Sequence, residues 1–180
     1  DRVVRHLEGN LDVLELHDYR HVWKDEMPDV GGYDSVRVVA WSMGVWAASL
    51  LVSRWGLVPR SAIALNGTGC PVDDRYGIPL KGYLLTERGM DERGRDKFFR
   101  RMLDSPQDAA WFEARKPCRP LEEQVEELRL VREQAAVRSG EMRWNVALIS
   151  ERDLIFPPVN QRNWWEGRCR TVSLRALCKK

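Results

Sequence analysis

The segment V-R-V-V-A-W-S-M-G-V-W (36–46) constrains the fold of this chain more than any other. A run of β-branched and apolar residues ends at Ser42, and a helical pattern begins just beyond it. Such short apolar runs are typical of strands buried on both faces of a parallel sheet. Ser42 then has two interpretations: it is a hydrolase nucleophile on a sharp strand-to-helix turn, or it caps the helix. The segment predicts a β–α unit and leaves the role of its serine open.

Further elements extend this unit into an α/β fold. The sequence predicts strands at 11–16, 36–41, 61–65, 144–149 and 171–174, and a helix over 43–55 with Ala47 and Ala48 on its inner side. Strands that alternate with helices indicate βαβ units. We therefore expect an α/β protein with a doubly wound, mostly parallel sheet.

From about Gly77 to Gly140 the pattern is helical throughout. Apolar residues recur at spacings of three and four, which predicts an amphipathic helix, at Leu121, Val125, Leu128, Val131 and Ala135. This stretch is too long for a simple crossover, so we expect an all-helical insertion between the third and fourth predicted strands. The predicted division is 1–76 for the first part of the core, 77–140 for a helical lid and 141–180 for the second part of the core.

Composition argues against several classes of protein. The net charge of +2 calls for no nucleic-acid partner, and no apolar run approaches the roughly 20 residues of a membrane span. The four cysteines are scattered without a CxxC pair, at Cys70, Cys118, Cys169 and Cys178. We therefore expect free thiols in a reducing cytoplasm, with no zinc site, disulfide framework or cofactor.

The residues around Ser42 fit a nucleophile turn. Small residues are needed two positions before and two after the serine, and Ala40 and Gly44 stand there, so A-W-S-M-G departs from G-x-S-x-G by one alanine. The turn lies at the carboxyl end of its strand, where open α/β sheets bind ligands. The backbone N–H of Met43, at the start of the helix, is the predicted donor to a developing oxyanion.

An acid in the expected order follows the fourth predicted strand. Asp153 stands in S-E-R-D, directly after residues 144–149, and the loop ends at Pro157 and Pro158, where a helix is expected to begin. Serine, helical insertion, strand and then aspartate is the order of an α/β-hydrolase. The alternative is that Asp153 caps the following helix.

A histidine is expected to complete the triad after the last strand. The three histidines, His6, His17 and His21, all precede Ser42. Without a base to accept its proton, a serine hydroxyl is a weak nucleophile. His17 follows the first predicted strand, at the sheet edge where Ser42 is expected, so it is a candidate base; a surface or packing role is the alternative.

Four segments carry a family resemblance: V-R-V-V-A-W-S-M-G-V-W-A-A, A-I-A-L-N-G-T-G-C-P-V-D-D-R-Y-G-I-P, F-F-R-R-M and I-S-E-R-D-L-I-F-P-P-V-N-Q-R-N-W-W. They resemble the BioG-type pimeloyl-[acyl-carrier protein] methyl ester esterases of biotin synthesis, from about Asp18 to Cys169. The resemblance implies an α/β-hydrolase with a helical lid. Its expected reaction removes the methyl group from the ω-carboxyl of a pimeloyl chain on acyl carrier protein.

The resemblance also implies roles for individual residues. Ser42 is the implied nucleophile and Asp153 the acid that orients the base, while Met43 donates its backbone N–H. Residues implied to contact the substrate or the acidic carrier protein are Trp41, Arg100 and Arg101. The two arginines lie in the basic stretch 87–101. The resemblance implies no cofactor and no metal.

Both ends of the chain depart from the family pattern. Family members begin with a further strand and a G-W-G-like oxyanion loop, and they end with a histidine near the position of Cys178. We interpret the chain as a fragment with an altered end, of marginal stability and with little or no esterase activity. The alternatives are an impaired protein that still binds acyl carrier protein, and an esterase or thioesterase with another substrate.

Overall fold

The computed structural model describes residues 2–7, 11–103, 106–114, 116 and 118–174. The strands are β1 (Arg2–Leu7), β2 (Leu11–Leu16), β3 (Arg37–Trp41), β4 (Ser61–Leu65), β5 (Val146–Ser150) and β6 (Arg170–Leu174). The helices are the 3-10 turn η1 (Val22–Lys24) and the α-helices α1 (Gly44–Trp55), α2 (Leu80–Arg88), α3 (Glu92–Arg100), α4 (Pro106–Glu113), α5 (Leu121–Ala135) and α6 (Pro158–Trp165). None of the helices in these ranges is both long and apolar enough to traverse a bilayer.

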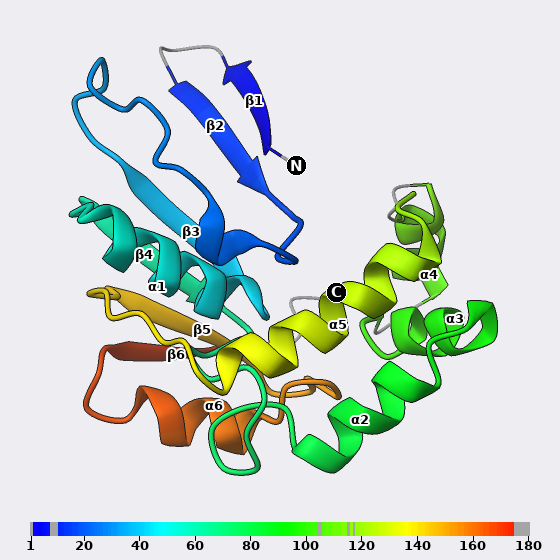
Figure 1. Ribbon diagram of the computed structural model, residues 1–180. Coiled ribbons are helices and arrows are strands. Elements are labelled where there is room, and N and C mark those ends of the chain that lie inside the picture. The colour runs from blue at the N-terminus through cyan, green and yellow to red at the C-terminus, as the bar shows by residue number, and fades with distance from the viewer. Residues whose placement is uncertain (1, 8–10, 104–105, 115, 117, 175–180) are drawn as a thin grey trace.

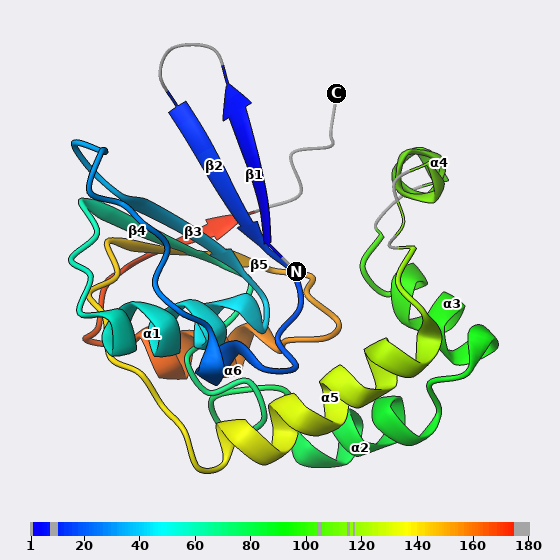
Figure 2. The ribbon, with the colours of Figure 1, turned by 45° about the horizontal axis from the view of Figure 1, so that its top comes forward.

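A four-stranded parallel sheet forms the centre of the protein, in the order β3-β4-β5-β6. Helices α1 and α6 lie on the same face of this sheet (Figures 1 and 2). That face is built largely from alanines, at Ala40, Ala62, Ala64 and Ala147. Small side chains let the helices approach the strands closely, and Trp144 and Trp165 fill the remaining space in an edge-to-face pair.

The predicted βαβ pattern is confirmed for four of the five strands. The strand at 61–65 is β4 without change, and β3, β5 and β6 differ from their predicted bounds by one or two residues at an end. The helix predicted over 43–55 is α1, with Ala47 buried as expected. Short apolar runs predicted the strands of the parallel sheet, and the small residues after Ser42 predicted α1.

The strand at 11–16 forms as β2, but the expectation that it joins the parallel sheet is wrong. It pairs antiparallel with β1 in a separate two-stranded sheet. The strand β1 was not predicted from the sequence. The register runs from Arg2 opposite Leu16 to Leu7 opposite Leu11. Only Glu8-Gly9-Asn10 separates the two strands in sequence, and pairing across so short a connection has a small loop-closure cost.

The helical insertion lies between β4 and β5, as predicted, and comprises α2, α3, α4 and α5. Helix α5 packs along α2, while α3 and α4 lie at the outer end of the insertion (Figures 1 and 2). Tyr83 of α2 is buried and donates a hydrogen bond to the Leu128 carbonyl of α5 at 2.9 Å. The domain limits at 76 and 140 stay a prediction.

Candidate active site

Ser42 occupies the turn between β3 and α1 in a left-handed conformation, with φ 54°. Its backbone N–H donates to the Leu65 carbonyl at the end of β4 at 2.9 Å, and its carbonyl accepts from Val45 at 3.1 Å. The N-cap of α1 is Met43, and no side chain caps this helix. The structure therefore does not support the capping interpretation of Ser42. A non-glycine residue in this conformation is strained, and such strain clusters at functional sites.

We expect Ser42→Gly to unfold with about 1 kcal/mol more free energy than Ser42→Ala, because glycine adopts a positive φ without the penalty that alanine retains. Urea denaturation of both variants measures the difference. The matched pair at Ser53, an exposed position inside α1, should show the reverse order, because glycine destabilises a helix interior. Equal stability of the two Ser42 variants would contradict the assignment of strain to this turn.

Two donors at the turn are unengaged within the described ranges: the Ser42 hydroxyl and the Met43 backbone N–H. The Met43 amide lies immediately before the first turn of α1, where helix N–H groups lack internal partners. An amide in this position can stabilise negative charge that develops on a carbonyl oxygen. The turn thus offers a hydroxyl and an oxyanion donor next to each other.

Gly44 is required by a neighbouring side chain. A Cβ added at Gly44 would lie 2.7 Å from the Tyr19 hydroxyl oxygen. Tyr19 comes from the segment after β2, and burial raises its pKa to about 12, so it stays a neutral phenol at physiological pH. Ala40, the other small residue of the motif, is buried in the core beneath the sheet. The small residues around Ser42 are thus explained by contacts with the rest of the fold.

A second left-handed residue, Asn66, stands at the end of β4 with φ 48°. Its side chain bonds reciprocally with Ser150 at the end of β5: Nδ2 donates to Oγ at 3.0 Å, and Oδ1 accepts from the Ser150 N–H at 2.8 Å. Gly67 follows it against the Ser42 backbone, where an added Cβ would be 2.2 Å from the Ser42 carbonyl oxygen. Strand ends β3, β4 and β5 are thereby held together at one edge of the sheet.

Asp153 lies in the loop after β5, at the same edge. Its Oδ1 accepts from the backbone N–H groups of Ile155 at 2.9 Å and Phe156 at 2.8 Å, and its Oδ2 accepts from the Gln161 side chain at 3.2 Å. The two backbone donors precede α6, which begins at Pro158, so Asp153 shapes the loop and does not cap the helix. Burial raises the pKa of the Asp153 carboxyl, and the three hydrogen bonds oppose that rise.

Most of the remaining predicted residues are exposed. Trp41 is 53% exposed at the end of β3, and Arg100 and Arg101 are exposed at the end of α3. His17 and His21 are also exposed, and neither bonds to Ser42 or Asp153 within the described residues. Cys178 and the side chain of His6 lie outside the described part of the chain.

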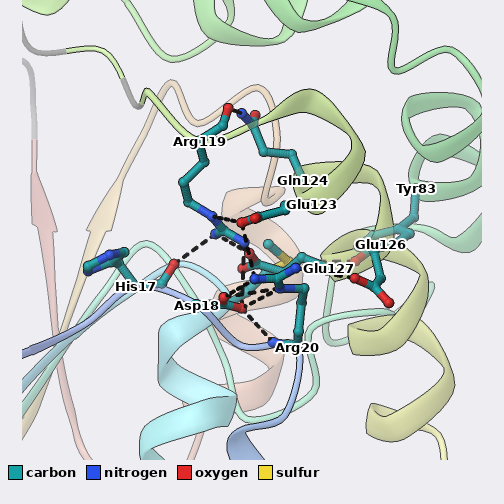
Figure 3. A network of polar contacts seen from close by, with 10 residues as sticks. His17, Asp18, Arg20, Tyr83, Arg119, Glu123, Gln124, Glu126 and Glu127 are labelled. Carbon is teal, nitrogen blue, oxygen red and sulfur yellow. Dashed lines mark hydrogen bonds and ion pairs between the residues drawn. The ribbon is translucent and has the colours of Figure 1, made fainter. Parts of the chain in front are cut away.

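An ion cluster joins the insertion to the segment after β2 (Figure 3). We call it the lid–core cluster; its members are Asp18, Arg20, Arg119, Glu123, Glu126 and Glu127. The Arg20 guanidinium donates hydrogen bonds to both carboxylate oxygens of Asp18 at 2.7–3.1 Å. It also forms ion pairs with Glu123 and Glu126 on α5. Burial would raise the pKa of Asp18, but the hydrogen bonds from Arg20 outweigh it and hold the pKa at about 2.

The other half of the cluster centres on Arg119 and Glu127. The Arg119 guanidinium pairs with the Glu127 carboxylate and donates to the His17 carbonyl at 3.0 Å. The Glu127 side chain is only 9% exposed, and burial raises its pKa while Arg119 opposes the rise. Within the described residues, no grouping of histidine, cysteine or acidic side chains could hold a metal ion. The ion pairs of the cluster join α5 to the segment that carries Tyr19.

Sequence reasoning identified the central residues of the site but missed their supports. The Asn66-Gly67 dipeptide is a turn signal that could have flagged a left-handed residue at the sheet edge. Gln161 and Tyr19 carry no local signal, because their roles depend on contacts with distant segments. Tyr83 is similar: its hydroxyl lies 3.6 Å from the Met43 sulfur, 40 positions away in sequence.

Comparison with known proteins places this chain in a family. The family model described as pimeloyl-ACP methyl esterase BioG matches residues 1–177. The crystal structure of BioG from Haemophilus influenzae superposes with a TM-score of 0.84 at 34% identity, covering 93% of this chain and 77% of that one. A deep-sea metagenomic α/β hydrolase, MGS-M2, shares the fold alone, with a TM-score of 0.50 at 17% identity over 79% of this chain and 57% of that one.

Two relatives are similar in sequence. An uncharacterised protein of Haemophilus influenzae is 39% identical over 91% of this chain and 74% of its own length. A malonyl-[acyl-carrier protein] O-methyltransferase of Bacteroides fragilis is 38% identical over 94% of this chain, which spans about a third of that relative (34%). The family model covers nearly all of the chain, and the fold agrees with it. The chain therefore belongs to the BioG family of pimeloyl-ACP methyl esterases and has the α/β-hydrolase fold.

Proposed function

We propose that this chain carries the serine-esterase machinery that removes the methyl ester from a pimeloyl chain on acyl carrier protein. One observation carries the proposal: Ser42 sits at φ 54° on a strand-to-helix turn, with its hydroxyl and the Met43 N–H unengaged within the described residues. Family membership supplies the substrate. In this assignment Ser42 is the nucleophile, Met43 the oxyanion donor and Asp153 the orienting acid.

The proposed reaction has two steps. Ser42 Oγ attacks the ester carbonyl carbon and loses its proton to a base, and methanol leaves with a proton returned by that base. Water then hydrolyses the acyl-enzyme, which frees the ω-carboxylate and restores the hydroxyl. Because neither described histidine side chain bonds to Ser42 or Asp153, we expect this chain to turn over slowly.

The chemistry of one relative supports the substrate class. The Bacteroides fragilis relative is named as a methyltransferase that acts on a malonyl group held by acyl carrier protein. An O-methyltransferase of that kind forms a methyl ester on a carrier-bound acid, and the proposed reaction cleaves a methyl ester on a longer carrier-bound acid. Formation and removal of such an ester are complementary steps.

The proposed contacts to the acyl carrier protein involve exposed residues. Arg100 and Arg101 present two cations at the end of α3, and complementary charge favours docking of an acidic carrier. Trp41 directly precedes Ser42, and its half-exposed ring offers an apolar surface to the acyl chain.

A fluorophosphonate probe and an ester assay test the nucleophile. We expect slow labelling at Ser42, located by peptide mass spectrometry, and slow loss of the methyl group from pimeloyl-[acyl-carrier protein] methyl ester. Ser42→Ala should abolish both signals, while Ser53→Ala, at an exposed serine in the last turn of α1, should leave both unchanged. Equal signals from Ser42→Ala and the parent chain would refute the assignment.

A second candidate function is a protein that binds the loaded carrier without hydrolysing it. It is favoured because neither His17 nor His21, the histidines whose side chains are described, bonds to Ser42 or Asp153. Binding measured by titration calorimetry separates the two. Binding with no detectable hydrolysis supports the second candidate, and rapid hydrolysis that depends on Ser42 excludes it. The rates of hydrolysis of a carrier-linked methyl ester, a free methyl ester and a thioester distinguish the proposed esterase from an esterase or thioesterase with another substrate.

A further inference from the structure

Gln161 on α6 is completely buried, although glutamine is normally a surface residue. Its carboxamide reaches the loop that carries Asp153. Nε2 donates to the Phe156 carbonyl at 2.8 Å and to Asp153 Oδ2 at 3.2 Å. One side chain thus closes the acid loop and touches the carboxylate itself.

The chemistry of these partners fixes the orientation of the amide. A carbonyl and an ionised carboxylate only accept hydrogen bonds, so the NH₂ group must face both of them. The Gln161 carbonyl oxygen then points the other way, and it is buried without a hydrogen-bond partner among the described residues. A buried acceptor without a partner is costly. The two bonds of the NH₂ group, one of them to Asp153, therefore set the orientation of the side chain.

The Gln161 amide bonds Oδ2, the Asp153 oxygen that accepts no backbone hydrogen bond among the described residues. Both backbone N–H donors bond Oδ1, and Gln161 is the donor on Oδ2 within the described residues. A carboxylate has about four acceptor sites, and three are filled. Because both oxygens are held, the carboxylate plane is fixed, and one acceptor site remains for the N–H of a base.

The same face of α6 also supports the nucleophile turn. Trp165 lies four residues after Gln161, one helical turn further on, and its Nε1 donates to the Gly67 carbonyl at 3.0 Å. Gly67 packs directly against the Ser42 backbone. Helix α6 therefore contacts the acid loop through one side chain and the support of the nucleophile through the other.

We infer that Gln161 is a positioning residue, which acts through Asp153 by fixing Oδ2 and orienting the open acceptor site toward the base of the proposed esterase. This inference rests on the proposed function, in which Asp153 is the acid that orients the base. A purely structural Gln161 would need only its bond to Phe156. The two roles differ in whether loss of the amide alters Asp153 itself.

Carboxyl-detected NMR titration of the ¹³C-labelled chain tests the inference, with Asp153→Asn used to assign the signal. Gln161→Met keeps the side-chain length and removes the donor. Since that hydrogen bond favours the ionised form, the Asp153 titration midpoint should move to higher pH in this variant. The Ile155 and Phe156 amide signals should stay in place.

Asn160→Leu is the matched control. Asn160 is the preceding residue and is also buried, but its amide donates to the Asp74 and Gly77 carbonyls, in the loop before α2. Both variants lose hydrogen bonds of a buried amide, so both should lose stability. Only Gln161→Met should shift the titration midpoint of Asp153. An unchanged midpoint in folded Gln161→Met, or an equal shift in Asn160→Leu, overturns the inference.

Gln161→Glu provides a second, nearly isosteric variant should Gln161→Met fail to fold. It places another carboxyl against Asp153 Oδ2, so the two groups should share a proton and titrate in two coupled steps. A single unshifted Asp153 step would count against the contact. None of these readouts requires turnover. A shifted Asp153 midpoint without any Ser42-dependent hydrolysis supports the contact and rejects the proposed function. Ser42-dependent hydrolysis with an unshifted midpoint rejects only the positioning role.

Discussion

Replacement of Arg119 by methionine is expected to lower the free energy of unfolding by about 3–5 kcal/mol, because it leaves Glu127 as a buried carboxylate without its counter-ion. The loss should depend on pH in a defined direction. Burial raises the folded-state pKa of Glu127, and Arg119 opposes that rise, so the variant raises it further. An acid whose pKa is raised by folding contributes its stability at low pH and loses it as pH rises. The deficit should therefore be larger at pH 8 than at pH 5, as measured by urea denaturation.

Two controls make this result specific. Arg129→Met breaks an exposed ion pair with Glu133 on the same helix and should cost about 0.5 kcal/mol or less. Addition of Glu127→Gln to Arg119→Met should recover most of the loss, because no buried charge remains. A small, pH-independent effect of Arg119→Met would mean that the lid–core cluster does not fasten α5 to the core.

Gly67→Ala should be the second severe change, with a loss of about 3 kcal/mol and displacement of the Ser42 turn. The added methyl group would lie 2.2 Å from the Ser42 carbonyl oxygen and 2.8 Å from its carbonyl carbon. The contacted atoms belong to the Ser42 backbone, and the Cβ position is fixed by the backbone of residue 67, so no side-chain rotation relieves the contact. Thermal or urea denaturation measures the loss, and probe labelling at Ser42 should fall with it.

Gly82→Ala is the matched control for this substitution. Gly82 lies inside α2, and an added Cβ there meets no atom within 4 Å. Alanine is the better helix former, so this variant should gain about 1 kcal/mol. If Gly67→Ala unfolds at the same denaturant concentration as the parent chain, the close packing of the β4 turn on the Ser42 turn is wrong.

Local patterns allowed much of the fold to be predicted. The apolar runs of β4 and β5, the helical pattern of α1 and the all-helical stretch after β4 each show their type within one window of sequence. The strand at 11–16 was identified for the same reason. Its antiparallel partner β1 was not predicted, because the alternation at 11–16 indicates a strand without indicating which strand it pairs with.

The same division applies to the candidate site. Ser42, Met43 and Asp153 stand out from their spacing relative to strands and helices. Gln161 and Arg119 do not: the first looks like one polar residue of a helix, and the second like one of many surface arginines. Their contacts with Asp153 and Glu127 cross segments that no local pattern links.

By itself the sequence determined the order of elements, the turn that holds Ser42 and the place of Asp153 after β5, because backbone periodicity and turn chemistry are local properties. Only the tertiary structure decided what supports them. Tyr19 against Gly44, Gly67 against the Ser42 backbone and Gln161 on Asp153 are packing contacts between distant segments. Close packing and the desolvation of buried polar groups arise only when these segments meet, so no window of the sequence contains them.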